Sequence, residues 1–311
     1  MELPHDLVRT LLAAVDEGTF DAAAASLHLT PSAVSQRIKA LEQRTGRVLL
    51  MRTKPIRPTE SGEVVVRFAR QLAALEQAAQ LDLGLADDTE ADGPRAAARL
   101  TVVVNADSLA TWFLTALTRV PQDPPVCFEL LREDEGHSAT LLREGRVMAA
   151  VTSSAEPVAG CTVRPLGLAR YLPVATPEFV RRWLSPGPPS RRLPHAPVVV
   201  YDRRDELQDR FVRTLTRGRT GAGPLRHHVP TSEGFRDAVA AGLGWGLVPD
   251  MQAAPLLDAG TLVELVPGKH LDVPLYWQQW KLDTPSLAAV AEAVAAASRE
   301  LLHSRGGGGR G

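Results

Sequence analysis

The N-terminal part of the chain carries apolar residues at the spacing of a helix. Leu7 and Leu11 lie on one face of a first helix that we expect over residues 3–15. Gly18 interrupts this pattern, and an alanine-rich stretch over residues 21–27 favours a second helix, because alanine is the strongest helix former. The sequence therefore opens with a compact helical unit.

A third helix begins with a clear start signal. Thr30 is a good N-cap, and Pro31 is tolerated at the first helical position because an N–H there would have no partner. The helix is expected to run to Thr45 and to stop at Gly46. Its inward face carries three apolar residues at helical spacing: Val34, Ile38 and Leu41.

The outward face of this third helix is polar and can both donate and accept hydrogen bonds, as readout of base edges in the major groove requires. Gln36 is the best candidate for a bidentate base contact. Residues 48–58 then predict two short strands around a basic turn, a wing that contacts the DNA backbone. The candidate DNA-contacting residues are Thr30, Ser32, Ser35, Gln36, Arg37, Lys39, Arg52, Lys54 and Arg57. On periodicity alone, a three-helix packing module with a merely solvated polar face fits equally well.

A long helix is predicted over residues 59–84, with Thr59 as its N-cap and acidic residues in its first turn. Apolar residues alternate at spacings of three and four, which indicates a heptad seam for dimerisation. The seam consists of Val65, Phe68, Leu72, Leu75 and Ala79. The alternative is an amphipathic helix that covers the core of its own domain.

From residue 99 onward, strand-like apolar runs alternate with helical patterns, which indicates an α/β fold. We expect a DNA-binding domain over 1–58, a linker helix over 59–84 and a hinge over 85–98, where acidic residues precede a Gly-Pro pair. The glycine-rich end, residues 304–311, predicts a disordered tail.

Composition narrows the function classes. The 311 residues carry a formal net charge of -1, yet residues 31–57 contain seven arginines and lysines against the single acid Glu42, as phosphate binding requires. Only Cys127 and Cys161 are present, and no apolar run is long enough to span a membrane, so we expect a cytoplasmic protein. The pair His227-His228 lacks metal-ligand spacing, and no nucleophile, histidine and acid are arranged for catalysis. We expect neither a metal, a cofactor nor an enzyme.

The segments 20–24 and 30–42, which read FDAAA and TPSAVSQRIKALE, resemble the N-terminal signature of the LysR-type transcriptional regulators. That resemblance implies a winged helix-turn-helix that binds a double-stranded DNA operator, and assembly as a homodimer or a dimer of dimers. It also implies a C-terminal domain similar to two-lobed periplasmic binding proteins. Lobe 1 would comprise residues 99–170 and 273–303, and lobe 2 residues 171–272. Effector binding would change the recruitment of RNA polymerase.

Four further segments, at 105–113, 231–235, 242–246 and 274–278, are similar to the LysG/ArgP branch of that family. This similarity implies a basic amino acid, lysine or arginine, as effector and a basic amino-acid exporter gene as target. A small-molecule-binding protein or enzyme with an N-terminal interaction module is the alternative.

The effector cleft is expected where loops follow the strands, because ligands of α/β sheets bind at the carboxyl ends of the strands. Ser108 is expected to bind a carboxylate, and an acid among Glu133, Asp134 and Asp202 to pair with a cation. The full set is Ser108, Thr111, Trp112, Glu133, Asp134, Thr152, Asp202, Thr231 and Glu233. Taken singly, each is better explained as a helix cap, a loop residue or, for Trp112, a core residue or part of the cleft wall, and the expectation rests on their convergence at strand ends.

Overall fold

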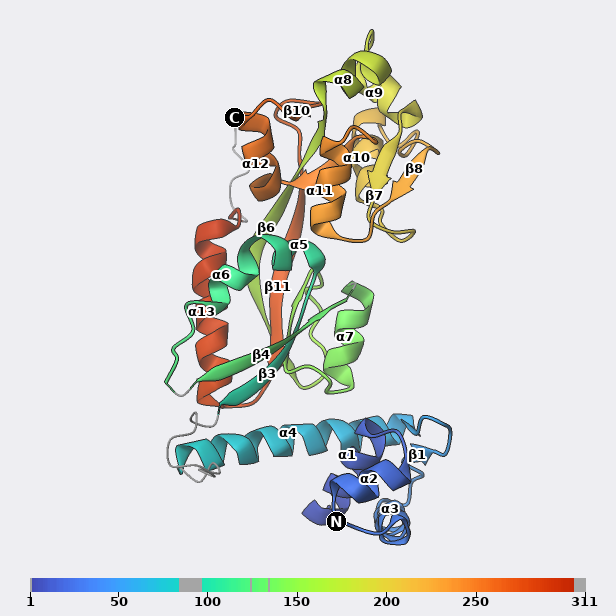
Figure 1. The fold of residues 1–311 in the computed structure, drawn as a ribbon, viewed down its shortest axis with the longest axis vertical. Helices are drawn as coiled ribbons and strands as arrows, with labels where there is room; N and C mark the ends of the chain where they lie inside the picture. The colour runs from blue at the N-terminus through green and yellow to red at the C-terminus, as the bar shows by residue number, and fades with distance from the viewer. Residues whose placement is uncertain (1, 84–96, 124, 134, 305–311) are drawn as a thin grey trace.

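The computed structural model describes residues 2–83, 97–123, 125–133 and 135–304. A small helical unit at one end is joined by a long helix to a larger α/β part (Figure 1). The helical unit and the long helix consist of α1 (His5–Asp16), α2 (Phe20–Ser26), α3 (Pro31–Thr45), β1 (Leu50–Met51), β2 (Arg57–Pro58) and α4 (Glu60–Asp82).

Threonine caps begin three of these four helices. The hydroxyl oxygens of Thr19, Thr30 and Thr59 accept hydrogen bonds from backbone N–H groups in the first turns of α2, α3 and α4. Gly46 ends α3 in the left-handed conformation, with φ 64°. The predicted helices are confirmed, with bounds that differ by at most two residues.

The long helix α4 has three faces, because successive side chains of an α-helix are turned by about 100°. Val65, Val66 and Ala69 are buried against the helical unit. Another face meets the α/β part. The third is an exposed apolar stripe that contains Val64 (56% exposed), Phe68 (40%), Leu72, Leu75 (42%) and Ala79.

One residue of the predicted seam is therefore on the wrong face. Val65 is only 8% exposed and belongs to the core of the helical unit. Val64 takes its place at the start of the exposed stripe, four residues before Phe68. The heptad pattern did not distinguish the two adjacent valines, because either fits a spacing of three to four residues.

The α/β part is built on a mixed sheet in the order β10-β6-β11-β5-β3-β4, with β9 paired to β6. Strands β3, β4 and β5 are parallel to one another, whereas β6 and β11 pair antiparallel over ten residue positions. The strands are β3 (Ala98–Val104), β4 (Val126–Arg132), β5 (Ala149–Thr152), β6 (Cys161–Ala175), β7 (Val198–Val200), β8 (Arg226–His228), β9 (Gly246–Pro249), β10 (Val263–Glu264) and β11 (Leu271–Trp280).

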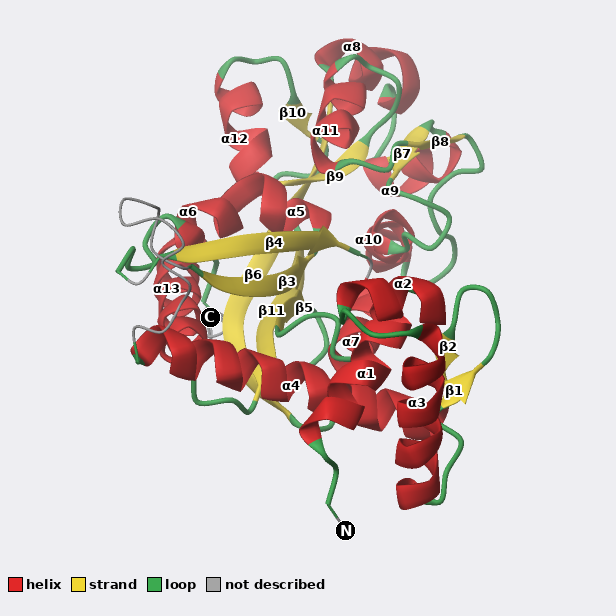
Figure 2. Cartoon of the chain, turned by 60° about the horizontal axis from the view of Figure 1, so that its bottom comes forward, coloured by secondary structure: helices red, strands yellow, loops and turns green. Residues whose placement is uncertain are grey.

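Helices cover the sheet, and Figure 2 shows α13 beside it, near the end of α4 that is far from the helical unit. The helices are α5 (Ala106–Ser108), the π-helix η1 (Leu109–Phe113), α6 (Leu114–Leu117), α7 (Glu135–Arg143), α8 (Pro177–Phe179), the π-helix η2 (Val180–Leu184), α9 (Pro189–Arg192), the 3-10 helix η3 (Leu193–His195), α10 (Leu207–Thr216), α11 (Ser232–Ala240), α12 (Asp250–Asp258) and α13 (Pro285–Leu301).

The two long strands β6 and β11 pass from one hydrophobic core to another. One core gathers around Trp112 and Trp277, and a second around Phe211 and Trp245. The two predicted lobe boundaries, at 170/171 and 272/273, fall inside β6 and β11, so both strands connect the two regions. The predicted hinge lies outside the described residues except for 97 and 98, as does the predicted tail beyond residue 304.

Candidate functional site

Helix α3 presents its polar residues to solvent because its apolar residues hold it against the helical unit. Val34, Ile38 and Leu41 are buried. On the opposite side, Ser32, Gln36 and Lys39 are exposed and Ser35 is half-buried, whereas the hydroxyl of Thr30 is engaged as the N-cap. The structure thus leaves the base-reading candidates free of the core, at the end of the molecule away from the sheet (Figure 1).

Arg37 differs from its neighbours on α3. Its guanidinium Nη1 donates to Thr10 Oγ1 at 3.4 Å, and its Nε lies 4.0 Å from Asp6 Oδ2. Both partners belong to α1. The structure therefore gives Arg37 a role in fixing the recognition helix to α1, which the sequence pattern did not indicate.

The wing is a two-stranded ribbon in which Leu50 pairs with Pro58 and Met51 with Arg57. Arg52 and Lys54 lie in its exposed turn, and Arg57 is exposed on its second strand. Glu42, the single acid in this basic stretch, anchors the ribbon to α3: its Oε1 accepts from the backbone N–H of Leu49 at 2.8 Å. The wing cations are thus held beside the polar face of α3.

A second candidate site is a cleft of about 840 Å³ in the α/β part. It is formed where the loops after β3, β4, β5 and β7 and the start of α10 face β6 and β11. Its charged lining residues are five acids and three arginines: Asp107, Glu133, Asp202, Asp205, Glu206, Arg132, Arg204 and Arg210. A cleft of this size suits a small ligand, and its excess of carboxylates favours a ligand that carries a cation.

Asp107, in the first turn after β3, is held by two hydroxyl groups. Tyr171 of β6 donates to its Oδ2 at 2.7 Å, and Ser232, the first residue of α11, donates to its Oδ1 at 2.6 Å. Burial raises the pKa of the Asp107 carboxyl above its usual value, and the charge of Glu233 adds to the rise, although both hydroxyl donors oppose it. A buried carboxylate held by neutral donors is electrostatically suited to a cationic partner.

Asp205 is a second carboxylate of this kind, at the start of α10. It accepts backbone hydrogen bonds from Tyr201 at 2.8 Å and Leu207 at 3.0 Å. Burial raises the pKa of Asp205 as well, and the negative charge of Asp107 contributes to the rise. The two acids therefore interact electrostatically across the cleft.

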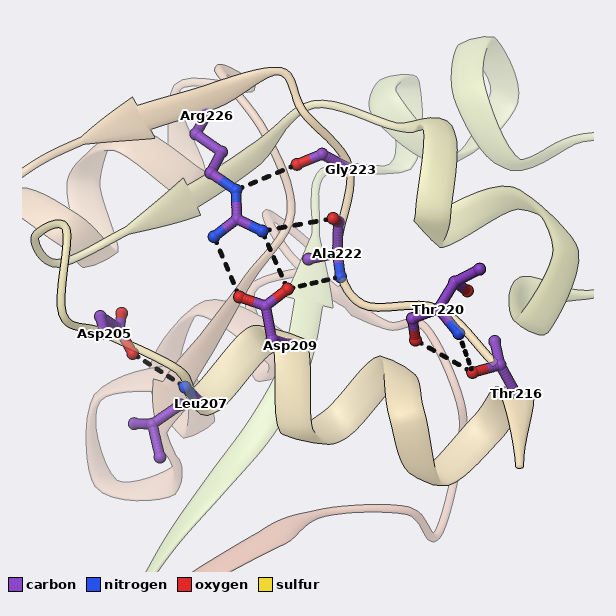
Figure 3. A network of polar contacts seen from close by, with 8 residues as sticks. All are labelled: Asp205, Leu207, Asp209, Thr216, Thr220, Ala222, Gly223 and Arg226. Carbon is purple, nitrogen blue, oxygen red and sulfur yellow. Dashed lines mark hydrogen bonds and ion pairs between the residues drawn. The ribbon is translucent and has the colours of Figure 1, made fainter. Parts of the chain in front are cut away.

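The neighbouring acid Asp209 shows the contrasting case (Figure 3). Arg226 donates to both of its carboxylate oxygens, at 2.9 and 2.8 Å, and the N–H of Ala222 donates at 2.9 Å. Burial alone would raise the pKa of Asp209, but these donors outweigh it and hold the pKa below its usual value. The ion pair anchors α10 to the first residue of β8, and the bond from Ala222 anchors it to the segment before that strand, so the helix that begins beside Asp205 is fixed.

The structure brings together some of the predicted effector-binding residues and not others. Glu133 and Asp202 line the cleft. Trp112 is a core residue that packs edge-on against Phe113. Ser108 is buried, and its N–H is bound by Asn105. Neither of these two is in the cleft lining, so no described contact supports a role for them in binding.

The remaining predicted residues take local structural roles. The Thr111 hydroxyl donates to the backbone oxygen of Asp107, that of Thr152 accepts from Ser154, and Thr231 caps α11. Glu233 is exposed in the first turn of α11, and Asp134 lies outside the described residues. The predicted loops reach the cleft, but Asp107 and Asp205 were missed because a strand-end rule locates a loop and not the side chain that turns inward.

The described residues contain no cluster of three or more histidines, cysteines and acids that could hold a metal ion. Within the same residues, no helix is long and apolar enough to cross a membrane.

Comparison with known proteins identifies both domains. A sequence model described as "Bacterial regulatory helix-turn-helix protein, lysR family" matches residues 5–63, and one described as "LysR substrate binding domain" matches residues 93–299. The chain belongs to the LysR family of transcriptional regulators. It is thus a DNA-binding regulator with an N-terminal helix-turn-helix and a C-terminal effector domain, and not an enzyme.

Individual relatives confirm the predicted branch of the LysR family. The lysine export transcriptional regulatory protein LysG of Corynebacterium glutamicum is 42% identical over 295 residues, or 94% of this chain and 97% of that protein. A crystal structure of ArgP from Mycobacterium tuberculosis is 46% identical, with 98% and 100% of the chains covered and a TM-score of 0.88. Full-length LysG from C. glutamicum with bound effector Arg is 39% identical, with 97% and 100% covered and a TM-score of 0.80.

The raised pKa of Asp107 in this LysR-family regulator predicts a pH-dependent stability difference. Because its pKa is raised by folding, its contribution to stability falls as pH rises from the pKa of an unfolded carboxyl through the folded value. The variant Asp107→Asn lacks this loss, so its stability relative to wild type should increase with pH in that window. All five tryptophans lie in the effector domain, so fluorescence-detected urea unfolding measures it.

Asp272→Asn is the matched control, for which we expect stability to change with pH in the opposite direction. Hydrogen bonds from Arg170 hold the pKa of Asp272 below its usual value, so it stabilises above the unfolded pKa and that stability is lost as pH falls. Its variant should therefore lose stability relative to wild type as pH rises. Parallel pH profiles for the two variants would contradict the raised pKa of Asp107.

Proposed function

We propose that this regulator senses a basic amino acid, arginine or lysine, in the cleft of its effector domain and thereby controls a gene for basic amino-acid export. The observation that carries the proposal is the pair Asp107 and Asp205, two half-buried carboxylates in the cleft lining. Neutral hydroxyl and N–H groups donate to them, and desolvation raises the pKa values of both. A ligand guanidinium or ammonium supplies the charge that this pair needs. The bound arginine named for C. glutamicum LysG supports the same choice.

An amino acid also carries a carboxylate, and the cleft offers groups of the opposite sign for it. Arg132, Arg204 and Arg210 line the same cavity. Guanidinium groups bind carboxylates through two parallel hydrogen bonds. We therefore expect the α-carboxylate of the effector near these arginines and its side-chain cation near Asp107 and Asp205. In this proposal the arginines take the role that sequence reasoning assigned to Ser108.

Citrulline tests the cationic requirement because it has the shape of arginine without the charge. Isothermal titration calorimetry should show binding of arginine and lysine, and at least tenfold weaker binding of citrulline, since a hydrogen bond to a charged group contributes about 1.5–3 kcal/mol. Asp107→Asn should reduce the preference for arginine over citrulline. Equal affinity of wild type for the two ligands would contradict the proposed effector class.

For DNA, we propose that α3 reads bases in the major groove while the wing contacts phosphates. Gln36 and Ser32 are exposed on α3, whereas Lys54 and Arg52 lie in the turn of the wing. Ser35 and Lys39 complete the face of α3, and Arg57 that of the wing. The contact of Arg37 with α1 favours an orienting role for that residue.

Two alanine variants separate base reading from phosphate binding. Gln36→Ala should relax the preference at one base pair, since a bidentate contact contributes about 1–3 kcal/mol of discrimination. Lys54→Ala should weaken binding to all sequences alike and lower the salt dependence by about one counterion. Gel-shift titrations with the operator and with single-base variants measure both effects. A uniform loss in Gln36→Ala would contradict the assignment of the reading face.

We further propose that two copies pair along the exposed stripe of α4, Val64, Phe68, Leu72, Leu75 and Ala79. Solvent contact of apolar side chains at i, i+4, i+8, i+11 and i+15 is unfavourable, and a second helix buries them. A two-fold pair then places both readers on one side of the DNA, about one helical turn or a multiple apart. A dimer of such dimers, recruitment of RNA polymerase and action in the cytoplasm, where the chromosome lies, belong to the same proposal.

The dimer proposal predicts the effect of a charge placed in the stripe. Phe68→Glu should shift the sedimentation equilibrium towards monomer, because the carboxylate would be buried between helices without a partner. Ala73→Glu, also exposed on α4 but outside the stripe, should leave the assembly unchanged. An unchanged mass for Phe68→Glu would show that another surface holds the subunits together.

A further inference from the structure

Helix α7 connects the effector cleft to the linker helix. Strand β4 ends at Arg132, and Arg132 and Glu133 line the cleft. Helix α7 begins at Glu135 and ends at Arg143, close to α4 (Figure 1). Any change in the position of α7 that accompanies ligand binding therefore reaches α4 directly.

The end of α7 is bound by two arginines of α4. Arg67 Nη1 donates to the backbone oxygen of Arg143 at 3.3 Å, and Arg70 Nη1 donates to that of Glu144 at 2.9 Å. Carbonyl groups at a helix C-terminus lack partners within the helix and carry partial negative charge, so cations stabilise them. Side chains of α4 thus complete the hydrogen bonds of a helix in the effector domain.

Gly145 allows this close approach. Its φ of +73° favours glycine, and a Cβ at this position would lie 3.1 Å from the Cα of Arg67. The backbone of the turn after α7 is therefore packed directly on the backbone of α4, and the contact is more than a pairing of long side chains.

Arg70 also binds the DNA-binding domain. Its Nη2 donates to Asp16 Oδ1 at 2.5 Å, and Asp16 is the last residue of α1. One guanidinium thus lies between a carboxylate and the C-terminal ends of two helices, α1 and α7, all of which carry negative charge. The Arg70 side chain is 19% exposed, whereas that of Asp16 is 48% exposed.

Helix α1 in turn contacts the recognition helix. At its other end, Asp6 and Thr10 hold Arg37 of α3. A continuous series of contacts therefore runs from the cleft through α7, Arg70 and α1 to α3. Spatial continuity alone does not establish energetic coupling, which a mutant cycle measures.

We propose that Arg70 couples effector binding to DNA binding, because it is bonded at once to α7 of the effector domain and to α1 of the DNA-binding domain. This inference rests on the proposed function and takes control of the target gene to include a change in affinity for the operator when a basic amino acid binds in the cleft. The coupling is measured by the ratio of operator Kd values without and with saturating arginine. Allosteric ratios are typically on the order of 5–150.

The test uses full-length Arg70→Ala, Asp16→Asn and the double variant. In Arg70→Ala the ratio should fall to within about twofold of 1, while calorimetry shows unchanged affinity for arginine without DNA. Asp16→Asn, which keeps the bond to α7, should give an intermediate ratio. The double variant should match Arg70→Ala, because Arg70→Ala already removes the bond between Arg70 and Asp16.

Arg119→Ala is the matched control. Arg119 forms a bidentate pair with Glu300 inside the effector domain, with bonds of 2.9 and 2.8 Å, and its loss should leave the ratio unchanged. A wild-type ratio for a folded Arg70→Ala or Asp16→Asn variant, or multiplicative losses in the double variant, would overturn the inference alone. A ratio of 1 for wild type would instead overturn the proposed function, and the inference with it.

Discussion

Successive residues of an α-helix are turned by about 100°, so the side chains of α4 point in three directions. One set, including Val66, completes the core of the DNA-binding domain, and a second, including Arg70, meets the effector domain. The third, including Phe68, remains apolar and exposed. Most side chains of α4 thus contact one neighbour, whereas Arg70 contacts both domains, and a shift of the whole helix affects all three faces. Helix α4 therefore contacts both domains.

The cleft supplies the other half of the account, because its charges are incompletely compensated. Asp209 has its own arginine, and its pKa lies below the usual value. Asp107 and Asp205 lie in the cleft lining, and burial raises their pKa values. A cationic ligand in the cleft therefore stabilises the charged forms of Asp107 and Asp205 and leaves Asp209 unaffected. Asp107 also joins β6, through Tyr171, to α11, through Ser232, so a ligand that binds it acts on both sides of the cleft.

The helix-turn-helix could be predicted from sequence because local rules determine it. Thr30, Pro31 and Gly46 bound α3 as N-cap, first residue and C-cap, and the structure agrees. The effector domain was less predictable. Only residues 172–175 of β6 read as a strand from sequence, and α13 went unpredicted, although the alanine-rich run after Pro285 was a usable signal. Glu133 and Asp202 line the cleft as expected, whereas Ser108 does not. Whether Asp107 or Ser108 faces the cavity depends on tertiary packing, which periodicity does not encode.

We propose that arginine binding in the cleft and operator binding by the helix-turn-helix change each other's affinity. Thermodynamic linkage requires that the factor by which arginine changes the operator Kd equals the factor by which the operator changes the arginine Kd. Both can be measured on the same full-length protein at one salt concentration, by gel shift with added arginine and by calorimetry with and without operator DNA. The account predicts two equal factors that differ from 1. Arginine affinity that is identical with and without the operator would contradict it.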